Sequence, residues 1–168
     1  MTRGGVAWIT VFGLGRMRPA SGTWGSLPPV LLAAGLIFAG YGPAAQPLVY
    51  NGCLIVVLVV FSFACTAQGD AVEARSIKGK DPSEAVADEV AGQCLPLLFL
   101  PAASLATPAV AAFTLVYAFL CFRVLDIFKP WPANSLQRIP GGWGILLDDL
   151  FAGAYAAVLV QVMTRSVL

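Results

Sequence analysis

Residues 19–69 read PASGTWGSLPPVLLAAGLIFAGYGPAAQPLVYNGCLIVVLVVFSFACTAQG and contain no Asp, Glu, Lys or Arg. A transmembrane helix needs about 20 predominantly apolar residues, so this stretch of 51 residues has room for two helices. Gly40, Gly42 and Pro43 interrupt the stretch near its middle, and such residues are typical of turns. We therefore predict two membrane spans joined by a turn around Gly42.

Two further uncharged stretches follow. Residues 90–122 are punctuated by Pro96, Pro101 and Pro108, which predicts a hairpin of two short spans, and residues 150–164 predict a last span. Only 11% of the residues are charged, against about 25% in soluble domains. We predict one all-α integral membrane domain over residues 1–168, with about five short or full spans.

The basic residues predict the orientation of these spans. All but Arg165 lie before the first span or in two long charged loops, whereas both hairpin tips carry no charge. Cytoplasmic loops carry the excess of Lys and Arg, so the amino terminus and the charged loops are predicted to face the cytoplasm. The net charge of +1, without a basic run, indicates no nucleic-acid partner.

Five of the nine acidic residues lie where the charged loops meet apolar segments: Asp88, Glu89, Asp126, Asp148 and Asp149. A carboxylate inside a span costs roughly 2.5–3.5 kcal/mol, and neighbouring carboxylates repel one another, so we expect a bound cation among them. Oxygen ligands without histidine or thiolate favour Mg²⁺ or Mn²⁺. Two alternatives stay open: Asp148 and Asp149 in a first helical turn that still lies in water, and Asp88 and Glu89 on a solvated edge of a helix that begins at Asp81.

Basic residues accompany the acids in the second charged loop. Arg123, Asp126 and Lys129 share one helical face by their spacing, Pro130 should end that helix, and Arg138 follows in the same loop. The spacing fits a pair of surface salt bridges, and it equally fits a site in which the bases bind an anion such as phosphate.

The loop at residues 16–27 is rich in Gly, Ser and Thr and precedes the first span. Such a loop suits an anion held by backbone N–H groups and hydroxyls at the start of a helix, here those of Thr23 and Ser26. The alternative is a plain loop that leads into a helix. The candidate phosphate-binding residues are thus Arg123, Lys129, Arg138, Thr23 and Ser26.

The sequence lacks several motifs of known phosphatases, and these absences limit the possible reaction mechanisms. The chain has no histidine, no Cys followed by Arg at the spacing of cysteinyl phosphatases, and no Asp-x-Asp-x-Thr. These absences argue against phosphatases with a His, Cys or Asp nucleophile. What remains is direct attack by a metal-activated water, with a carboxylate as base.

Three segments together resemble the bacterial phosphatidylglycerophosphatase A family. They are Asp81-Pro82-Ser83…Asp88-Glu89-x-x-Gly92, Phe122-Arg123-x-x-Asp126-x-x-Lys129-Pro130-x-Pro132 and Gly141-Gly142-x-Gly144-Ile145-x-x-Asp148-Asp149-x-x-Ala152-Gly153, and the loop Gly22-Thr23-x-Gly25-Ser26 matches as well. Two positions depart from the family pattern: Ser21, where Pro is common, and Gln137, where some members carry an acid.

The resemblance implies an enzyme of the bacterial inner membrane with its active site facing the cytoplasm. It implies Mg²⁺-dependent hydrolysis, with Mn²⁺ as a possible substitute, of the terminal phosphate of phosphatidylglycerophosphate, which gives phosphatidylglycerol. We expect catalytic roles for all five acids, and metal ligation by Glu89, Asp126, Asp148 and Asp149.

Two other function classes stay open. A metal-dependent lipid head-group phosphotransferase also uses clustered aspartates, but the expected run of Asp-Gly, Ala-Arg and two later aspartates is not satisfied around residues 70–75. A cation transporter would also keep carboxylates in its spans, but it would not need Arg123, Lys129 and Arg138 beside them. Phosphate release without a nucleotide would exclude the first, and ion-flux assays would test the second.

Overall fold

The structure is a computed structural model that describes residues 8–73, 85–136, 139 and 141–167. Every regular element in these ranges is helical, which confirms the all-α prediction. The α-helices are α1 (Ser21–Phe38), α2 (Pro47–Glu73), α3 (Ala87–Cys94), α4 (Pro108–Phe128), α5 (Ala133–Leu136) and α6 (Gly142–Ser166). Short 3-10 helices lie at η2 (Val11–Arg16), η3 (Leu95–Leu97) and η4 (Ala102–Leu105).

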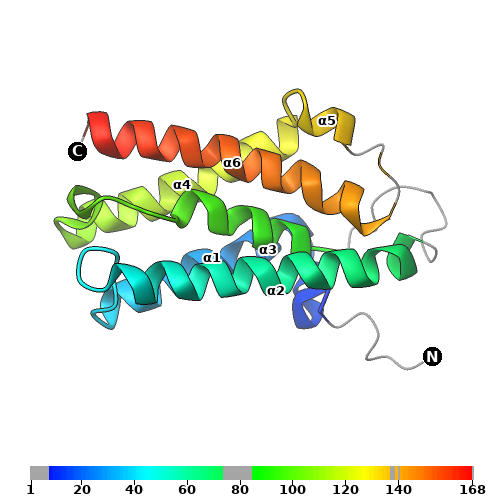
Figure 1. Ribbon diagram of the computed structural model, residues 1–168, viewed down its shortest axis with the longest axis horizontal. Coiled ribbons are helices and arrows are strands. Elements are labelled where there is room, and N and C mark those ends of the chain that lie inside the picture. Colours follow the sequence, from blue (N-terminus) through cyan, green and yellow to red (C-terminus); the bar gives the residue numbers. More distant parts are fainter. Residues whose placement is uncertain (1–7, 74–84, 137–138, 140, 168) are drawn as a thin grey trace.

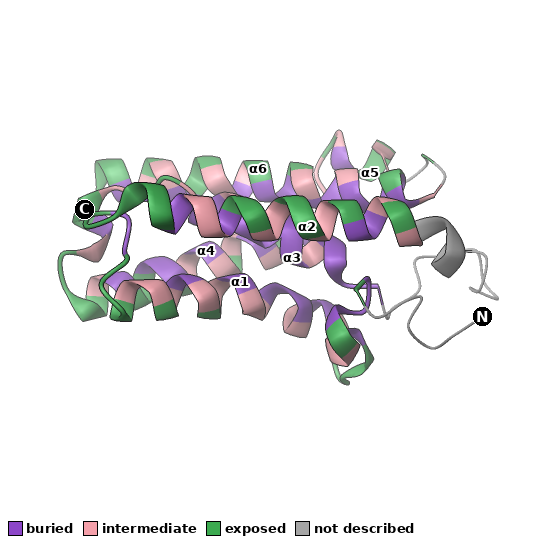
Figure 2. Ribbon diagram, turned by 60° about the horizontal axis from the view of Figure 1, so that its bottom comes forward, coloured by how far each residue is buried: buried purple, intermediate pink, exposed green. Residues whose placement is uncertain are grey.

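The long helices run side by side along one axis, and α3 lies among them (Figure 1). Four helices are long and apolar enough to cross a membrane: α1, α2 as far as Gln68, α4 and α6. Figure 2 shows the buried residues concentrated on α3 and on the inward faces of the long helices, while the outward faces are largely exposed. Outward faces rich in Leu, Val and Phe are suited to contact with lipid.

The turns confirm several predictions from the sequence. Helix α1 ends at Phe38, and Gly40 takes a φ of 83° in the turn that leads to α2, a conformation that favours glycine. Helix α4 ends at Phe128, two residues before Pro130, and its last turn closes with the Lys129 N–H donating to the Leu125 carbonyl over 2.8 Å.

The stretch at residues 90–122 divides differently from the predicted hairpin of two short spans. Helix α3 has 8 residues, whereas α4 is a full span of 21 residues. The reason is that Pro108 begins a new helix, α4. Proline is well suited to the first position of a helix, because the N–H that it lacks would have no partner there. The Thr107 side chain caps this helix by accepting from the Val110 N–H over 3.2 Å.

The first charged loop requires a correction. The sequence predicted a continuous helix from Asp81 through Glu89, but Ala85 and Val86 are not helical and α3 begins at Ala87. Residues 81–84 lie outside the described residues. The N–H groups of Val86 and Ala87 instead donate to the Ile9 carbonyl over 2.9 and 3.2 Å. The contact with Ile9 thereby sets where α3 begins, directly before Asp88 and Glu89.

Candidate active site

Four helix ends meet at the same end of the bundle, and three of these helices, α3, α4 and α6, bring charged residues there. The four are the amino-terminal ends of α1, α3 and α6 and the carboxyl-terminal end of α4 (Figure 1). The carboxyl terminus of α6 lies at the opposite end. Residues from positions 22 to 149 therefore meet in one place, as the sequence led us to expect from the charge pattern.

Three carboxylates form a group that could hold a metal ion. Asp88 and Glu89 come from α3 and Asp149 from α6, and one oxygen from each lies within 4.8 Å of the others. Glu89 Oε2 and Asp149 Oδ2 are buried and accept no hydrogen bond. Burial, aided by the nearby carboxylates of Asp149 and Asp126, raises the pKa of Glu89 to about 8. Buried acids with unused oxygens fit a hard divalent cation such as Mg²⁺.

Glycines one helical turn beyond the acids let α3 and α6 approach each other. A Cβ atom on Gly92 would lie 2.7 Å from the Asp149 backbone oxygen, and one on Gly153 would lie 2.3 Å from the Gly92 backbone oxygen. Any side chain at either position would push the helices apart. Gly92 follows Glu89 by three residues and Gly153 follows Asp149 by four, so the close contact lies directly beside the carboxylate group.

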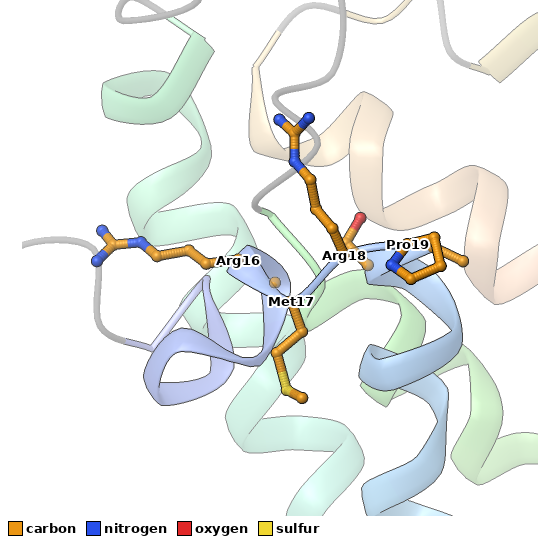
Figure 3. A pocket seen from close by; sticks show the side chains of 7 residues that line it. Arg16, Met17, Arg18 and Pro19 are labelled. Carbon is orange, nitrogen blue, oxygen red and sulfur yellow. The ribbon is translucent and has the colours of Figure 1, made fainter.

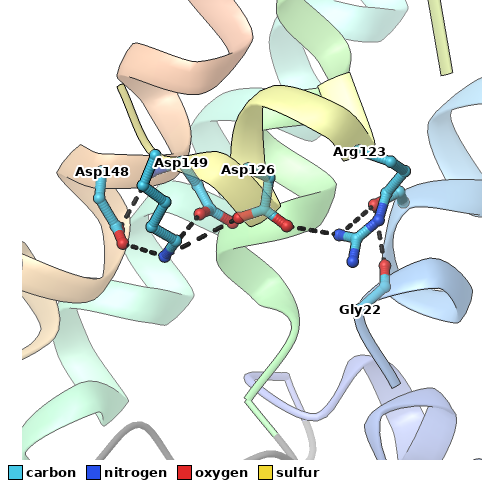
Figure 4. Close-up of polar contacts among 7 residues, drawn as sticks. Gly22, Arg123, Asp126, Asp148 and Asp149 are labelled. Carbon is cyan, nitrogen blue, oxygen red and sulfur yellow. Dashed lines mark hydrogen bonds and ion pairs between the residues drawn. The ribbon is translucent and has the colours of Figure 1, made fainter. Parts of the chain in front are cut away.

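The positive charge of Lys129 lies among three aspartates of the site. Its ammonium group binds Asp148, and it lies 3.8 Å from Asp126 Oδ1 and 3.7 Å from Asp149 Oδ1 (Figure 4). Burial lowers the pKa of Lys129, but the carboxylates of Asp149, Asp148 and Asp126 outweigh burial and raise it above its usual value. Lys129 is thus a permanent cation, and it joins the end of α4 to the start of α6.

Arg123 links α4 to α1. Its Nη1 donates to Asp126 Oδ2 over 2.6 Å and to Ser26 Oγ over 3.3 Å, and Ser26 Oγ donates to the Gly22 carbonyl over 2.8 Å. Arg123 Nε is buried and has no partner, so the guanidinium keeps a donor for a further acceptor. A phosphate oxygen is the kind of acceptor that this planar group suits.

Gly22 places Arg123 beside the carboxylate group. A Cβ on Gly22 would lie 2.6 Å from Glu89 Oε1 and 2.9 Å from Arg123 Nη2. Both head groups lie within 3 Å of one point, so the carboxylate and the guanidinium are less than 6 Å apart. Figure 4 shows Gly22 next to the Arg123 side chain, with Asp126, Asp148 and Asp149 continuing the row of charges.

The predicted site residues are distributed as follows. All five acids, with Arg123, Lys129 and Ser26, lie in this cluster. The metal set proposed from the sequence stays a prediction, and the geometry divides the acids differently, because Asp126 and Asp148 are bound by Arg123 and Lys129 while Asp88 joins Glu89 and Asp149. Thr23 lies half-buried in the first turn of α1. Arg138 falls outside the described residues.

The sequence placed Gly22, Gly92 and Gly153 in the segments that resemble the family but did not show that they position the charged residues. The spacing could have indicated Gly92 and Gly153, because each lies about one helical turn after an acid and therefore on the same face of its helix. Nothing in the spacing could reveal Gly22, because its neighbours Glu89 and Arg123 come from two other helices.

The fold and this site define a helical membrane protein in which buried carboxylates and bases meet at one end of the helix bundle, an arrangement suited to phosphate chemistry. Comparison with known proteins agrees, since the family model described as "Phosphatidylglycerophosphatase A" matches residues 7–164. The chain belongs to the phosphatidylglycerophosphatase A family, and it is an enzyme, a lipid phosphatase.

Three relatives illustrate this membership. A Bacteroides thetaiotaomicron protein named "Putative phosphatidylinositol-3-phosphatase" is 35% identical over 91% of this chain and 89% of its own length. "Phosphatidylglycerophosphatase A" of Haemophilus influenzae is 31% identical over 89% of this chain and 82% of its own. The Escherichia coli protein of the same name is 36% identical over 46% of this chain and 41% of its own. No solved structure matches this chain.

Proposed function

We propose that this enzyme hydrolyses the terminal phosphate monoester of phosphatidylglycerophosphate to phosphatidylglycerol and inorganic phosphate, and that it requires Mg²⁺. The observation that carries the proposal is the juxtaposition of three acids that could hold a metal with a guanidinium less than 6 Å from Glu89. The family supports a lipid phosphatase, and two of the relatives carry this substrate in their names.

Asp88, Glu89 and Asp149 would hold the divalent cation, because one oxygen of each lies within 4.8 Å of the others and because Glu89 and Asp149 each have a buried oxygen that accepts no hydrogen bond. Such a cation, when bound, polarises phosphoryl oxygens and lowers the pKa of water. Mn²⁺ prefers the same oxygen ligands and should substitute for it.

Arg123 binds the phosphate through the donor that its contacts with Asp126 and Ser26 leave unused. Its charge stabilises the negative charge that develops on the phosphoryl oxygens in the transition state. A water oxygen forms the new bond to phosphorus, the bond from phosphorus to the glycerol oxygen breaks, and the leaving oxygen takes a proton. A carboxylate of the cluster accepts the proton that the water loses.

Lys129 supports the site by binding Asp148 from α6 while it follows the end of α4. Through this contact it holds Asp126, Asp148 and Asp149 in a fixed arrangement, which catalysis by positioning requires. The charge-free turn around Gly42 and the basic residues at the other end support an inner-membrane location with the site at the cytoplasmic face.

The test uses the full chain purified in a neutral detergent. Phosphate release from phosphatidylglycerophosphate should stop after complete chelation and return with Mg²⁺ or Mn²⁺. Glycerol 3-phosphate should be a far poorer substrate, because it lacks the lipid chains. Phosphatidylinositol 3-phosphate should be tested in the same assay, because one relative is named as a phosphatase of this lipid. Undiminished release after chelation would refute the metal requirement, and equal rates on the soluble ester would refute lipid specificity.

Asp149→Asn tests the proposed ligand set, since it removes a charge and keeps the size of the side chain. We expect a loss of at least 100-fold, about 2.7 kcal/mol in the barrier. An Asp149→Asn enzyme that keeps more than a tenth of the activity would exclude Asp149 from the reaction.

A further inference from the structure

A cavity lies at the loop that leads into α1, directly before the site residue Gly22 in the chain. It has a volume of about 550 Å³ and is lined by residues 15–21, the loop that leads into α1 (Figure 3). Its described lining contains the guanidinium groups of Arg16 and Arg18 and no carboxylate. The two arginine side chains point in different directions from the loop (Figure 3). Arg18 therefore brings a cation to the cavity, which suits an anionic group.

The cavity adjoins the site along the chain. Its lining ends at Ser21, and the next residue, Gly22, lies against Glu89 and Arg123. Gly22 comes four positions after Arg18, and a fully extended chain covers at most about 14 Å over that length. This short connection keeps Arg18 near the place where the terminal phosphate is proposed to bind.

Arg18 differs from Arg123 and Lys129 because it forms no ion pair with a described carboxylate. Arg123 binds Asp126, and Lys129 binds Asp148. Arg18 is exposed, and its side chain makes no ion pair with any carboxylate in the described part of the chain. Its charge is therefore available to an anion that arrives with the substrate.

We propose that Arg18 binds a second phosphate of the substrate, the phosphodiester that joins the lipid glycerol to the head-group alcohol. The inference rests on the proposed function, in which the terminal monoester lies at Arg123 and the acidic group. Phosphatidylglycerophosphate carries both a phosphodiester and a terminal monoester, and so does phosphatidylinositol 3-phosphate. Phosphatidic acid carries only a monoester. Arg18 thus selects phosphorylated head groups over a phosphate attached directly to the lipid glycerol.

The experiment compares two substrates in micelles of a neutral detergent, so that no charged surface competes. We measure kcat/KM for phosphatidylglycerophosphate and for phosphatidic acid with the wild type, Arg18→Gln and Arg18→Lys. Arg165→Gln is the matched control, because it removes an exposed arginine that bonds to Gln161 at the far end of α6.

Arg18→Gln should lower kcat/KM for phosphatidylglycerophosphate about tenfold or more, the effect of losing one charge-assisted hydrogen bond, and should leave phosphatidic acid unchanged. Arg18→Lys should recover part of the loss, since it keeps the charge, and Arg165→Gln should behave as the wild type. Equal losses on both substrates, or none on either, would overturn the assignment of Arg18 to the phosphodiester.

A second arm adds phosphatidylserine to the micelles. If Arg18 only binds an anionic membrane surface, Arg18→Gln will lower activity on both substrates in these micelles and on neither in neutral ones, which refutes the inference. If the wild type hydrolyses phosphatidylglycerophosphate and Arg18→Gln does so equally well, the role of Arg18 is refuted while the proposed function stands. A wild type inactive on every lipid phosphate monoester refutes the proposed function, and the inference fails with it.

Discussion

Gly22→Ala should disable the site without harming the fold. The added Cβ would lie 2.6 Å from Glu89 Oε1 and 2.9 Å from Arg123 Nη2, whereas ordinary contact begins at 3.4 Å. The Glu89 carboxylate must therefore retreat by about 0.8 Å and the guanidinium by about 0.5 Å. Both clashing groups are the ends of flexible side chains, so the helices can stay in place while the charges move.

The expected loss follows from the size of that displacement. A misplacement of about 1 Å in a catalytic arrangement can cost about 100-fold in rate, which is about 2.7 kcal/mol in the barrier. We expect Gly22→Ala to lose between 10- and 100-fold in kcat/KM for phosphate release from phosphatidylglycerophosphate in neutral micelles. Its unfolding temperature in detergent should equal or exceed that of the wild type, because Ala favours helix over Gly by up to about 1 kcal/mol.

Gly35→Ala is the matched control in the same helix. Nothing lies within 4 Å of a Cβ at Gly35, so this variant gains the same helix propensity without touching a charged group and should keep full activity. A Gly22→Ala enzyme that is folded and retains more than a third of wild-type kcat/KM would refute the reasoning. It would mean that the position of Glu89 and Arg123 does not limit the reaction.

Three further changes probe the cluster and the orientation. Arg123→Lys keeps the charge but loses the planar pair of donors, so kcat/KM should fall markedly with little change in the Mg²⁺ dependence; weaker Mg²⁺ binding as the sole defect would assign Arg123 to supporting the acids. Lys129→Met leaves buried acids without their cation and should destabilise the protein by about 3–5 kcal/mol in thermal unfolding, and adding Asp148→Asn should restore part of the loss; no rescue would deny that this pair matters. Cysteines introduced at Gly42 should react with an impermeant reagent in intact cells, and those at Met17 only after lysis; the reverse pattern would invert the topology.

The structure also explains why the family segments contain glycines beside their acids. Gly92 and Gly153 allow two helices to approach until backbone atoms of one nearly touch the other. This contact brings Asp149 next to Asp88 and Glu89, which long side chains between the helices would prevent. We therefore expect Gly153→Ala to lower kcat/KM by changing the spacing of α3 and α6.

The amino-acid sequence by itself determined the membrane class, the all-helical fold, the first two membrane spans and the set of charged residues at the site. Length and hydropathy decide whether a segment can leave water, and a proline or a run of charge ends it, so these properties can be read locally. The turn at Gly40 and the end of α4 before Pro130 were predictable for this reason. The family resemblance rested on residues that lie in sequence order along nearly the whole chain.

Only the tertiary structure decided how the charges divide. Spacing could place Arg123, Asp126 and Lys129 on one helical face, but it could not show that Lys129 binds Asp148 from another helix. Nor could it show that Asp88 joins Glu89 and Asp149 while Asp126 pairs with Arg123. Partners of opposite charge are chosen by distance and burial across helices, and those depend on how closely the backbones pack. Here that packing depends on glycines whose close neighbours are far away in the sequence.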